Sequence, residues 1–205
     1  GRQAATALRN ARALSTANTM LFDSLRALAL ALETKDPYSH GGTQQLVDLA
    51  FELGQARDLS DDERRALEVA ATLHDDGMAT AGGALMSAGP LTTMDRSLVT
   101  MHPKIAADIL AQAPSLSAVV PIVYHHHEHY DGGGYPSGAK GDEIPFLSRI
   151  MMLADAFDAM TSDRPYRMAM AKERALEIIH EEAGRQFHPD VAKALLSATQ
   201  LQPAL

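Results

Sequence analysis

Apolar residues follow a helical spacing along the first 34 residues of the chain. This stretch contains no Pro and, after its first residue, no Gly. Its apolar positions recur three and four residues apart, at Leu14, Ala17, Leu21, Leu25, Leu28 and Leu32. Because such positions lie on one face of a helix, the pattern predicts a long amphipathic helix. We interpret residues 1–27 as a linker helix that leads into a domain over residues 28–205. Its apolar face either packs on the domain core or joins two copies in a homodimer.

Turn signals divide the rest of the chain into shorter helices. The sequence Lys35-Asp36-Pro37-Tyr38 ends the first helix, because the residue before a proline is pushed out of the α region. We expect helices at about 43–56, 61–74, 95–113, 115–127, 145–160, 171–183 and 189–199, and loops at 77–93 and 129–144. No segment alternates between apolar and polar residues as a strand does, so the predicted fold class is all-α.

The composition is that of an ordinary globular protein. The 205 residues are 46% hydrophobic and 21% charged, so the chain can bury a core without disulfides. Its 18 basic and 26 acidic residues give a formal net charge of −8, which argues against binding to duplex nucleic acid. No run of about 18 apolar residues indicates a membrane span, and no segment resembles a secretion signal. We therefore expect a cytoplasmic location.

Candidate metal ligands are restricted to His, Asp and Glu, because the chain contains no Cys. Nine histidines are present, and four of them fall within residues 125–129. The adjacent pair His74-Asp75 offers an imidazole and a carboxylate near the end of a predicted helix, and these are common metal-binding groups. Taken alone, this pair also fits a core histidine that hydrogen-bonds its neighbour.

Candidate ligands and loop residues follow one another in a distinctive order: His74-Asp75, His102-Pro103, His126-His127-Glu128, the loop Asp131-Gly132-Gly133-Gly134-Tyr135-Pro136, and Asp155. With Lys35-Asp36-Pro37-Tyr38 and the segment 155–167, this order resembles the HD-GYP domain. That domain is a branch of the metal-dependent HD phosphohydrolases, and its members hydrolyse the bacterial messenger cyclic di-GMP. The resemblance extends from about Leu28 to Leu196. It implies an HD-type helical bundle with extra C-terminal helices and a glycine-rich GYP loop.

The resemblance also implies roles for individual residues. It maps the family's metal ligands onto His74, Asp75, His102, His126, His127 and Asp155, with His74 and Asp75 as catalytic residues. This set would hold one or two divalent ions of iron, manganese or zinc, because ligands without sulfur do not select among them. Cyclic di-GMP is the implied ligand, and its implied contacts are Tyr135, Asp158, Arg164 and Arg167.

Some of these implied contacts also have simpler structural interpretations. Guanidinium groups suit phosphate oxygens, which favours a phosphate-binding role for Arg164 and Arg167. Arg164 paired with Asp158 or Asp163 would instead be an ordinary surface ion pair. Tyr135 either stacks on a base of the ligand or holds the glycine-rich loop in place.

Two positions depart from the family pattern. Gly42 stands where the first metal-binding histidine is expected, with His40 nearby as a candidate substitute, and Met78 replaces the lysine of the HD-x-GK motif. A thioether neither carries a positive charge to phosphate nor donates a proton. Two interpretations follow. One is a metal-dependent phosphodiesterase for cyclic di-GMP with impaired or lost activity, and the other is a non-catalytic module that signals by binding the nucleotide or a protein partner.

Overall fold

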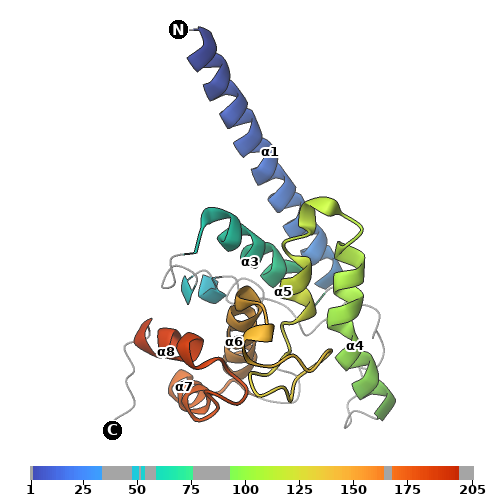
Figure 1. Ribbon diagram of the computed structural model, residues 1–205, viewed down its shortest axis with the longest axis vertical. Coiled ribbons are helices and arrows are strands. Elements are labelled where there is room, and N and C mark those ends of the chain that lie inside the picture. Colours follow the sequence, from blue (N-terminus) through green and yellow to red (C-terminus); the bar gives the residue numbers. More distant parts are fainter. Residues whose placement is uncertain are drawn as a thin grey trace.

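Helices make up the regular structure of the chain (Figure 1). The computed structural model describes residues 2–33, 48–50, 52–53, 59–75, 93–163 and 168–198, and none of these residues belongs to an extended strand. The α-helices are α1 (Arg2–Glu33), α3 (Asp61–Leu73), α4 (Thr93–Leu110), α5 (Val120–Tyr124), α6 (Phe146–Thr161), α7 (Lys172–Glu181) and α8 (Pro189–Ala198). Two short 3₁₀ helices, η2 (Pro114–Leu116) and η3 (Gly141–Glu143), lie between them. The predicted all-α fold is confirmed.

Helix α6 lies at the centre of the hydrophobic core. Its residues Ile150, Met151, Leu153 and Ala154 are completely buried. They are buried because α6 contacts four other helices, α3, α5, α7 and α8. Apolar residues of the surrounding helices pack on α6 in turn, as the amphipathic patterns predict.

The start and end of α3 are fixed by the local sequence. Ser60 Oγ accepts a hydrogen bond from the backbone N–H of Glu63 (3.3 Å), and the Glu63 carboxylate accepts one from the backbone N–H of Ser60 (2.9 Å). This reciprocal cap satisfies two N–H groups that the helix itself leaves unpaired. The helix ends at Leu73, so His74 and Asp75 follow directly at its C-terminal end.

The helix predicted at about 115–127 is wrong in its extent. The structure has η2 followed by the five-residue α5, and residues 125–127 form a turn. The Val123 carbonyl would accept the N–H of residue 127 in a longer helix, but it binds His126 Nδ1 at 2.6 Å instead. A side chain that competes for a backbone carbonyl in this way favours the end of a helix.

The predicted loop over residues 129–144 is present and is tied to its surroundings by backbone hydrogen bonds. Tyr130 N–H donates to the Gln186 carbonyl (3.1 Å), and Asp131 N–H donates to the Arg185 carbonyl (2.8 Å). Tyr135 N–H donates to the His127 carbonyl (3.1 Å). These bonds fix the loop both to the turn between α7 and α8 and to the turn after α5.

The long N-terminal helix is confirmed, and it extends well beyond the rest of the molecule (Figure 1). Near its C-terminal end Leu25 packs against the core, and α1 contacts α3 there. Of the helices in the described part of the chain, none has the length and apolar character needed to cross a membrane. The sequence predictions for His40, Gly42, Met78, Arg164 and Arg167 fall outside the described residues.

Candidate metal centre

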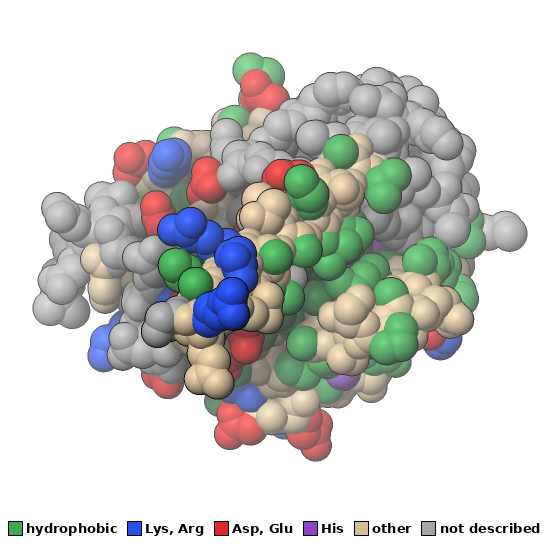
Figure 2. Space-filling view, turned by 90° about the horizontal axis from the view of Figure 1, so that it is seen from above, with side chains coloured by type: hydrophobic (Ala, Val, Ile, Leu, Met, Phe, Trp, Pro, Cys, Tyr) green, Lys and Arg blue, Asp and Glu red, His purple; other side chains and the backbone are tan. Residues whose placement is uncertain are grey.

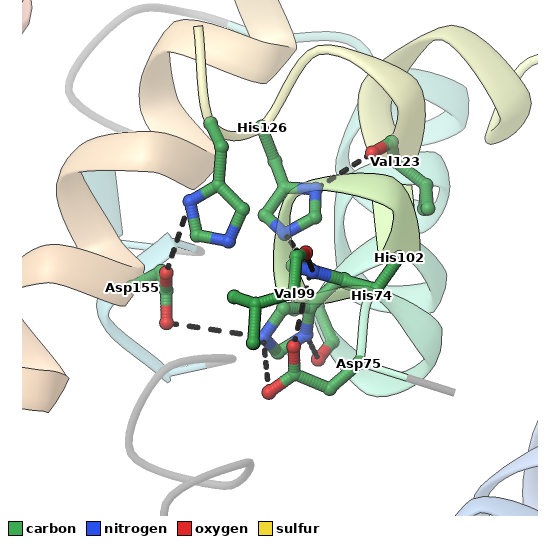
Figure 3. Close-up of polar contacts among 9 residues, drawn as sticks. His74, Asp75, Val99, His102, Val123, His126 and Asp155 are labelled. Carbon is green, nitrogen blue, oxygen red and sulfur yellow. Dashed lines mark hydrogen bonds and ion pairs between the residues drawn. The ribbon is translucent and has the colours of Figure 1, made fainter. Parts of the chain in front are cut away.

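The six predicted metal ligands lie together, although they come from four separate parts of the chain. Figure 3 labels all of them except His127. His74 and Asp75 follow α3, His102 lies within α4, His126 and His127 form the turn after α5, and Asp155 lies in α6. Two groups have ligand atoms close enough to share an ion: His102, His126 and His127 in one, and His74, Asp75 and His126 in the other. His126 belongs to both groups and is completely buried.

The two carboxylates bridge pairs of histidines. Asp75 Oδ2 lies 3.3 Å from His74 Nε2, and Asp75 Oδ1 lies 3.5 Å from His102 Nε2. Asp155 Oδ1 lies 3.8 Å from His74 Nε2, and Asp155 Oδ2 lies 4.0 Å from His127 Nδ1. Each carboxylate therefore has one oxygen directed toward each of two imidazoles.

Three of the imidazoles are anchored in the same way, by a backbone carbonyl three residues earlier. Nδ1 of His74 lies 2.9 Å from the Ala71 carbonyl, Nδ1 of His102 lies 2.6 Å from the Val99 carbonyl, and Nδ1 of His126 lies 2.6 Å from the Val123 carbonyl. Since a carbonyl oxygen only accepts, Nδ1 carries the proton in each case. Nε2 of each ring then faces the centre of the cluster, which is the usual arrangement of a metal-binding histidine.

This arrangement brings two nitrogen lone pairs face to face. His102 Nε2 and His126 Nε2 are 3.3 Å apart, and both rings use Nδ1 as their donor. Two neutral acceptors at this distance repel each other unless a positive charge lies between or beside them. The donor set of imidazole nitrogens and carboxylate oxygens therefore fits a divalent cation such as iron, manganese or zinc.

Electrostatics keep the imidazole side of the cluster neutral. Burial, together with the neighbouring histidines, lowers the pKa of His126 well below its usual value. Burial lowers the pKa of His127 to about 3, with a further contribution from the neighbouring His102. Burial also lowers the pKa of His102, although Asp75 opposes this. Neutral imidazoles can bind a metal ion without first losing a proton.

His74 and Asp75 behave differently. Burial by itself would lower the pKa of His74, but the charges of Asp75 and Asp155 outweigh it and raise this pKa to about 10. Desolvation raises the pKa of Asp75, but the charge and hydrogen bond of His74 outweigh it and hold this pKa well below its usual value. The pair therefore forms an imidazolium–carboxylate contact, and a bound metal ion would replace the proton of that contact.

Two residues expected to contact the ligand have identifiable partners in the structure. The Tyr135 ring lies 4.9 Å, centroid to centroid, from the His127 ring at an interplanar angle of 34°. Asp158 is buried one helical turn after Asp155, and its Oδ1 accepts a hydrogen bond from Ser162 Oγ (3.1 Å). Tyr135 thus contacts a candidate ligand directly, as expected if it holds the loop, and its role toward a nucleotide stays a prediction.

Sequence reasoning gave no role to Glu128, which the structure shows to be an anchor of the glycine-rich loop. Its side chain is completely buried, and its Oε1 accepts hydrogen bonds from both N–H and Oγ of Ser137 (2.7 and 2.6 Å). The position directly after two candidate ligands was the available signal, because the neighbours of a metal ligand commonly orient it.

Gly134 is a second residue whose role appears only in three dimensions. A β-carbon at this position would lie 2.6 Å from Glu128 Cα and would also clash with the His129 nitrogen and the His127 carbonyl oxygen. The loop therefore packs directly on the backbone of the turn that carries His126 and His127. Only a residue without a side chain permits this approach.

Comparison with known proteins identifies the family. An HD domain model matches residues 26–191. The chain belongs to the HD domain family. The resemblance inferred from the motifs is therefore confirmed, including its relation to proteins named as cyclic di-GMP phosphodiesterases.

Relatives within the HD family are named for cyclic dinucleotides. The chain is 35% identical over 177 residues to the cyclic di-GMP phosphodiesterase response regulator RpfG of Xanthomonas campestris, covering 85% of this chain and 47% of that protein. It is 33% identical over 178 residues to the 3′3′-cGAMP-specific phosphodiesterase 3 of Vibrio cholerae, covering 86% and 39%. The chain thus spans less than half the length of these curated relatives.

A solved structure supports the fold independently. The crystal structure of a cyclic GMP-AMP specific phosphodiesterase from Vibrio cholerae is similar to this chain with a TM-score of 0.69 at 20% sequence identity. The similarity covers 88% of this chain and 49% of that one. At this level of identity the likeness shows the shared helical fold.

Proposed function

We propose that this domain is a metal-dependent phosphodiesterase that opens a cyclic dinucleotide, with cyclic di-GMP as its substrate. The observation that carries the proposal is the pair of facing nitrogens, His102 Nε2 and His126 Nε2, 3.3 Å apart and flanked by Asp75. The relatives named for cyclic di-GMP and cGAMP favour a cyclic dinucleotide as the substrate class. A bound divalent ion would polarise the phosphoryl group and neutralise charge on the leaving oxygen.

The residues of the chain would prepare the site for this chemistry. The carbonyls of Val99 and Val123 hold the rings of His102 and His126 in the tautomer that presents Nε2. Asp75, with a side chain 60% exposed, lies where the cluster opens to solvent and can meet an incoming ion. The Tyr135 ring lies beside the His127 ring and would limit the access of water to it.

A second candidate function is a non-catalytic receptor for the same nucleotide. Gly42 and Met78 favour it, because they replace a metal-binding histidine and a lysine that the family pattern contains. Loss of one electrostatic stabiliser commonly reduces a catalytic rate by about 10²–10³. In this alternative the cluster keeps a metal ion and the arginines at 164 and 167 bind phosphate, but turnover is lost.

An assay of metal-loaded protein with cyclic di-GMP separates the two functions. If the domain is an enzyme, the linear product appears, and Asp75→Asn abolishes its formation. The matched control is His180→Ala, since His180 is exposed on α7 and lies outside the cluster. Binding of cyclic di-GMP without any product in the unaltered protein would contradict the enzyme and support the receptor.

A restoration experiment tests the cause of any deficit. The double variant Gly42→His with Met78→Lys should raise both bound metal per chain and the rate of hydrolysis, if these two positions limit activity. An increase in neither quantity would show that the alignment at these positions is wrong. Arg164→Ala should weaken nucleotide binding in either function while leaving bound metal unchanged, because guanidinium groups bind phosphate rather than cations.

A further inference from the structure

Helix α1 carries an apolar stripe with a seven-residue repeat, and several of its leucines are exposed. We propose that this stripe pairs with α1 of a second copy of the chain as a parallel two-stranded coiled coil. The first and fourth positions of the repeat are Ala4, Ala7, Ala11, Leu14, Asn18, Leu21, Leu25, Leu28 and Leu32. Apolar residues at these positions, sustained over about four repeats, are typical of a coiled coil.

Charge placement along α1 supports this register. All six charged residues of the helix occupy the second and sixth positions of the repeat: Arg2, Arg9, Arg12, Asp23, Arg26 and Glu33. In a two-stranded coil these two positions lie on the outer side of each helix, away from the seam and its flanks. A helix that only linked two folded parts would not need a stripe that is free of charged residues along its whole length.

The stripe is accessible in the structure. The side chains of Leu14, Leu21 and Leu28, all at the fourth position, are 65%, 47% and 62% exposed. Helix α1 extends away from the body in Figure 1, and Figure 2, seen from above, shows both apolar and basic side chains at the surface of the molecule. Leu25, in contrast, packs against the core, so the two helices would diverge from about this level.

An identical helix in parallel register is the occupant that this stripe fits best. Asn18 interrupts the apolar row at a first position, and a polar residue there needs a polar group at the same level of the partner. A second copy in register supplies one. An antiparallel partner would instead place its basic N-terminal half along the part of α1 that already contacts α3. The parallel arrangement leaves both bodies at the same end of the coil.

The oligomeric state of the chain tests the proposal. Sedimentation of the unaltered protein should show a dimer, and Leu14→Glu should weaken it at least about tenfold, because a charge would be buried in the seam. The matched control is Met20→Glu. Met20 is 64% exposed on the same helix but lies at a third, outward position, so the dimer should persist. A monomer for the unaltered protein, or equal effects of the two substitutions, would overturn the proposal.

Cross-linking tests the direction of the strands. The chain has no Cys, so a single introduced one gives an unambiguous result. Leu14→Cys should form a disulfide between two copies under oxidising conditions, because equivalent fourth positions face each other only in the parallel register. Met20→Cys should form far less of such a disulfide, because position 20 faces outward in this register. Failure of Leu14→Cys to cross-link in a protein that is dimeric would overturn the parallel arrangement.

A separate observation concerns Pro103, which lies inside α4 directly after His102. We infer that Pro103 is a positioning residue for His102. Proline has no backbone N–H, so the carbonyl four residues earlier, that of Val99, loses its helical partner. That carbonyl lies 2.6 Å from His102 Nδ1. The proline therefore frees the acceptor that sets the tautomer of a candidate metal ligand, and this inference rests on the proposed metal binding.

The substitution Pro103→Ala separates positioning from simple stability. Alanine restores an N–H that competes for the Val99 carbonyl, while it improves the helix by up to about 3 kcal/mol. We therefore expect unchanged or higher stability of chelator-treated protein, together with a fall in metal affinity of about 10–100-fold. Pro121→Ala is the matched control, because Pro121 lies in the first turn of α5 and frees no carbonyl beside a ligand.

The tautomer of His102 gives a readout that does not depend on a bound metal ion. Nitrogen NMR of metal-free protein should show His102 protonated at Nδ1, and Pro103→Ala should shift the population toward protonation at Nε2. A changed tautomer in a protein that binds no metal would support the role of Pro103 while contradicting the proposed function. An unchanged tautomer and unchanged affinity would overturn the role of Pro103.

Discussion

The two sides of the histidine cluster differ in how firmly they are held. On the imidazole side, His102 and His126 are 2% and 0% exposed, and a backbone carbonyl fixes each ring. On the carboxylate side, the side chains of Asp75 and Asp155 are 60% and 20% exposed. The buried side therefore sets the geometry of the site, whereas the exposed side supplies negative charge at its entrance. This division explains how neutral ligands can be arranged before any cation arrives.

The largest expected effect comes from the ligand that both groups share. His126→Ala should reduce bound metal per chain to background, because it removes a nitrogen from each candidate group at once. Asp155→Ala should remove less of the bound metal, since Asp155 lies at the edge of the cluster, with its Oδ1 3.8 Å from His74 Nε2. Elemental analysis of purified variants measures both. Equal losses for the two variants would contradict the idea that the imidazole side dominates.

A second large effect is expected in the loop that supports the imidazole side. Gly134→Ala should lower the free energy of unfolding by about 3 kcal/mol, because its β-carbon meets backbone atoms of residues 127–129. Gly133→Ala is the control, since its β-carbon would meet no atom closer than 3.1 Å, and that atom, Asp131 Oδ1, belongs to a side chain rather than to the backbone. Denaturation curves measure both variants. A Gly133→Ala effect as large as that of Gly134→Ala would show that the backbone contact is unimportant.

Most of the fold and the ligand set could be predicted from the sequence, and the reasons are physical. Helical spacing and proline placement are local properties, so the bounds of α1, α6, α7 and α8 fell within about two residues of expectation. The ligand set was implied by the resemblance to the HD-GYP domain. The six residues lie close together in the structure, as the distances among them show, and their binding of a metal ion stays a prediction.

The remaining features depend on contacts between distant or competing groups. The early end of α5 depends on His126 taking the Val123 carbonyl, and no periodicity reveals such competition. The need for glycine at position 134 depends on the backbone of residues 127–129, which the loop reaches only after folding. Glutamate usually lies at the surface of a protein. Glu128 is nevertheless only 2% exposed, and Ser137 donates a hydrogen bond to one of its carboxylate oxygens.

A smaller effect, of up to about 2.7 kcal/mol per pH unit, is expected when metal-free protein is acidified. His126 and His127 have pKa values lowered by burial, so below the unfolded value of about 6.5 the unfolded chain binds protons that the folded chain excludes. Stability should therefore fall as the pH decreases from 6.5. The pKa of His74 is raised to about 10, so its contribution is complete below 6.5 and is lost as the pH rises toward 10.

Urea denaturation of chelator-treated protein between about pH 5 and about pH 9 measures this profile. The free energy of unfolding should be greatest near neutral pH. His127→Gln should make the fall on the acid side less steep, because one of the excluded protons is no longer involved. If the free energy of unfolding instead increased steadily as the pH fell, the imidazole side would be protonated in the folded protein.

The smallest effect is expected at the anchor of the loop, and it tests whether the imidazole side is held independently. Ser137→Ala removes one of two hydrogen bonds to Glu128 Oε1 and should cost about 1 kcal/mol of stability. Because the Val123 carbonyl still fixes His126, metal affinity should change by less than about twofold. Glu128→Ala should cost about 2–3 kcal/mol, since it leaves the Ser137 N–H without its acceptor. If metal affinity falls in proportion to stability across these two variants, the loop rather than the backbone carbonyls orients the ligands.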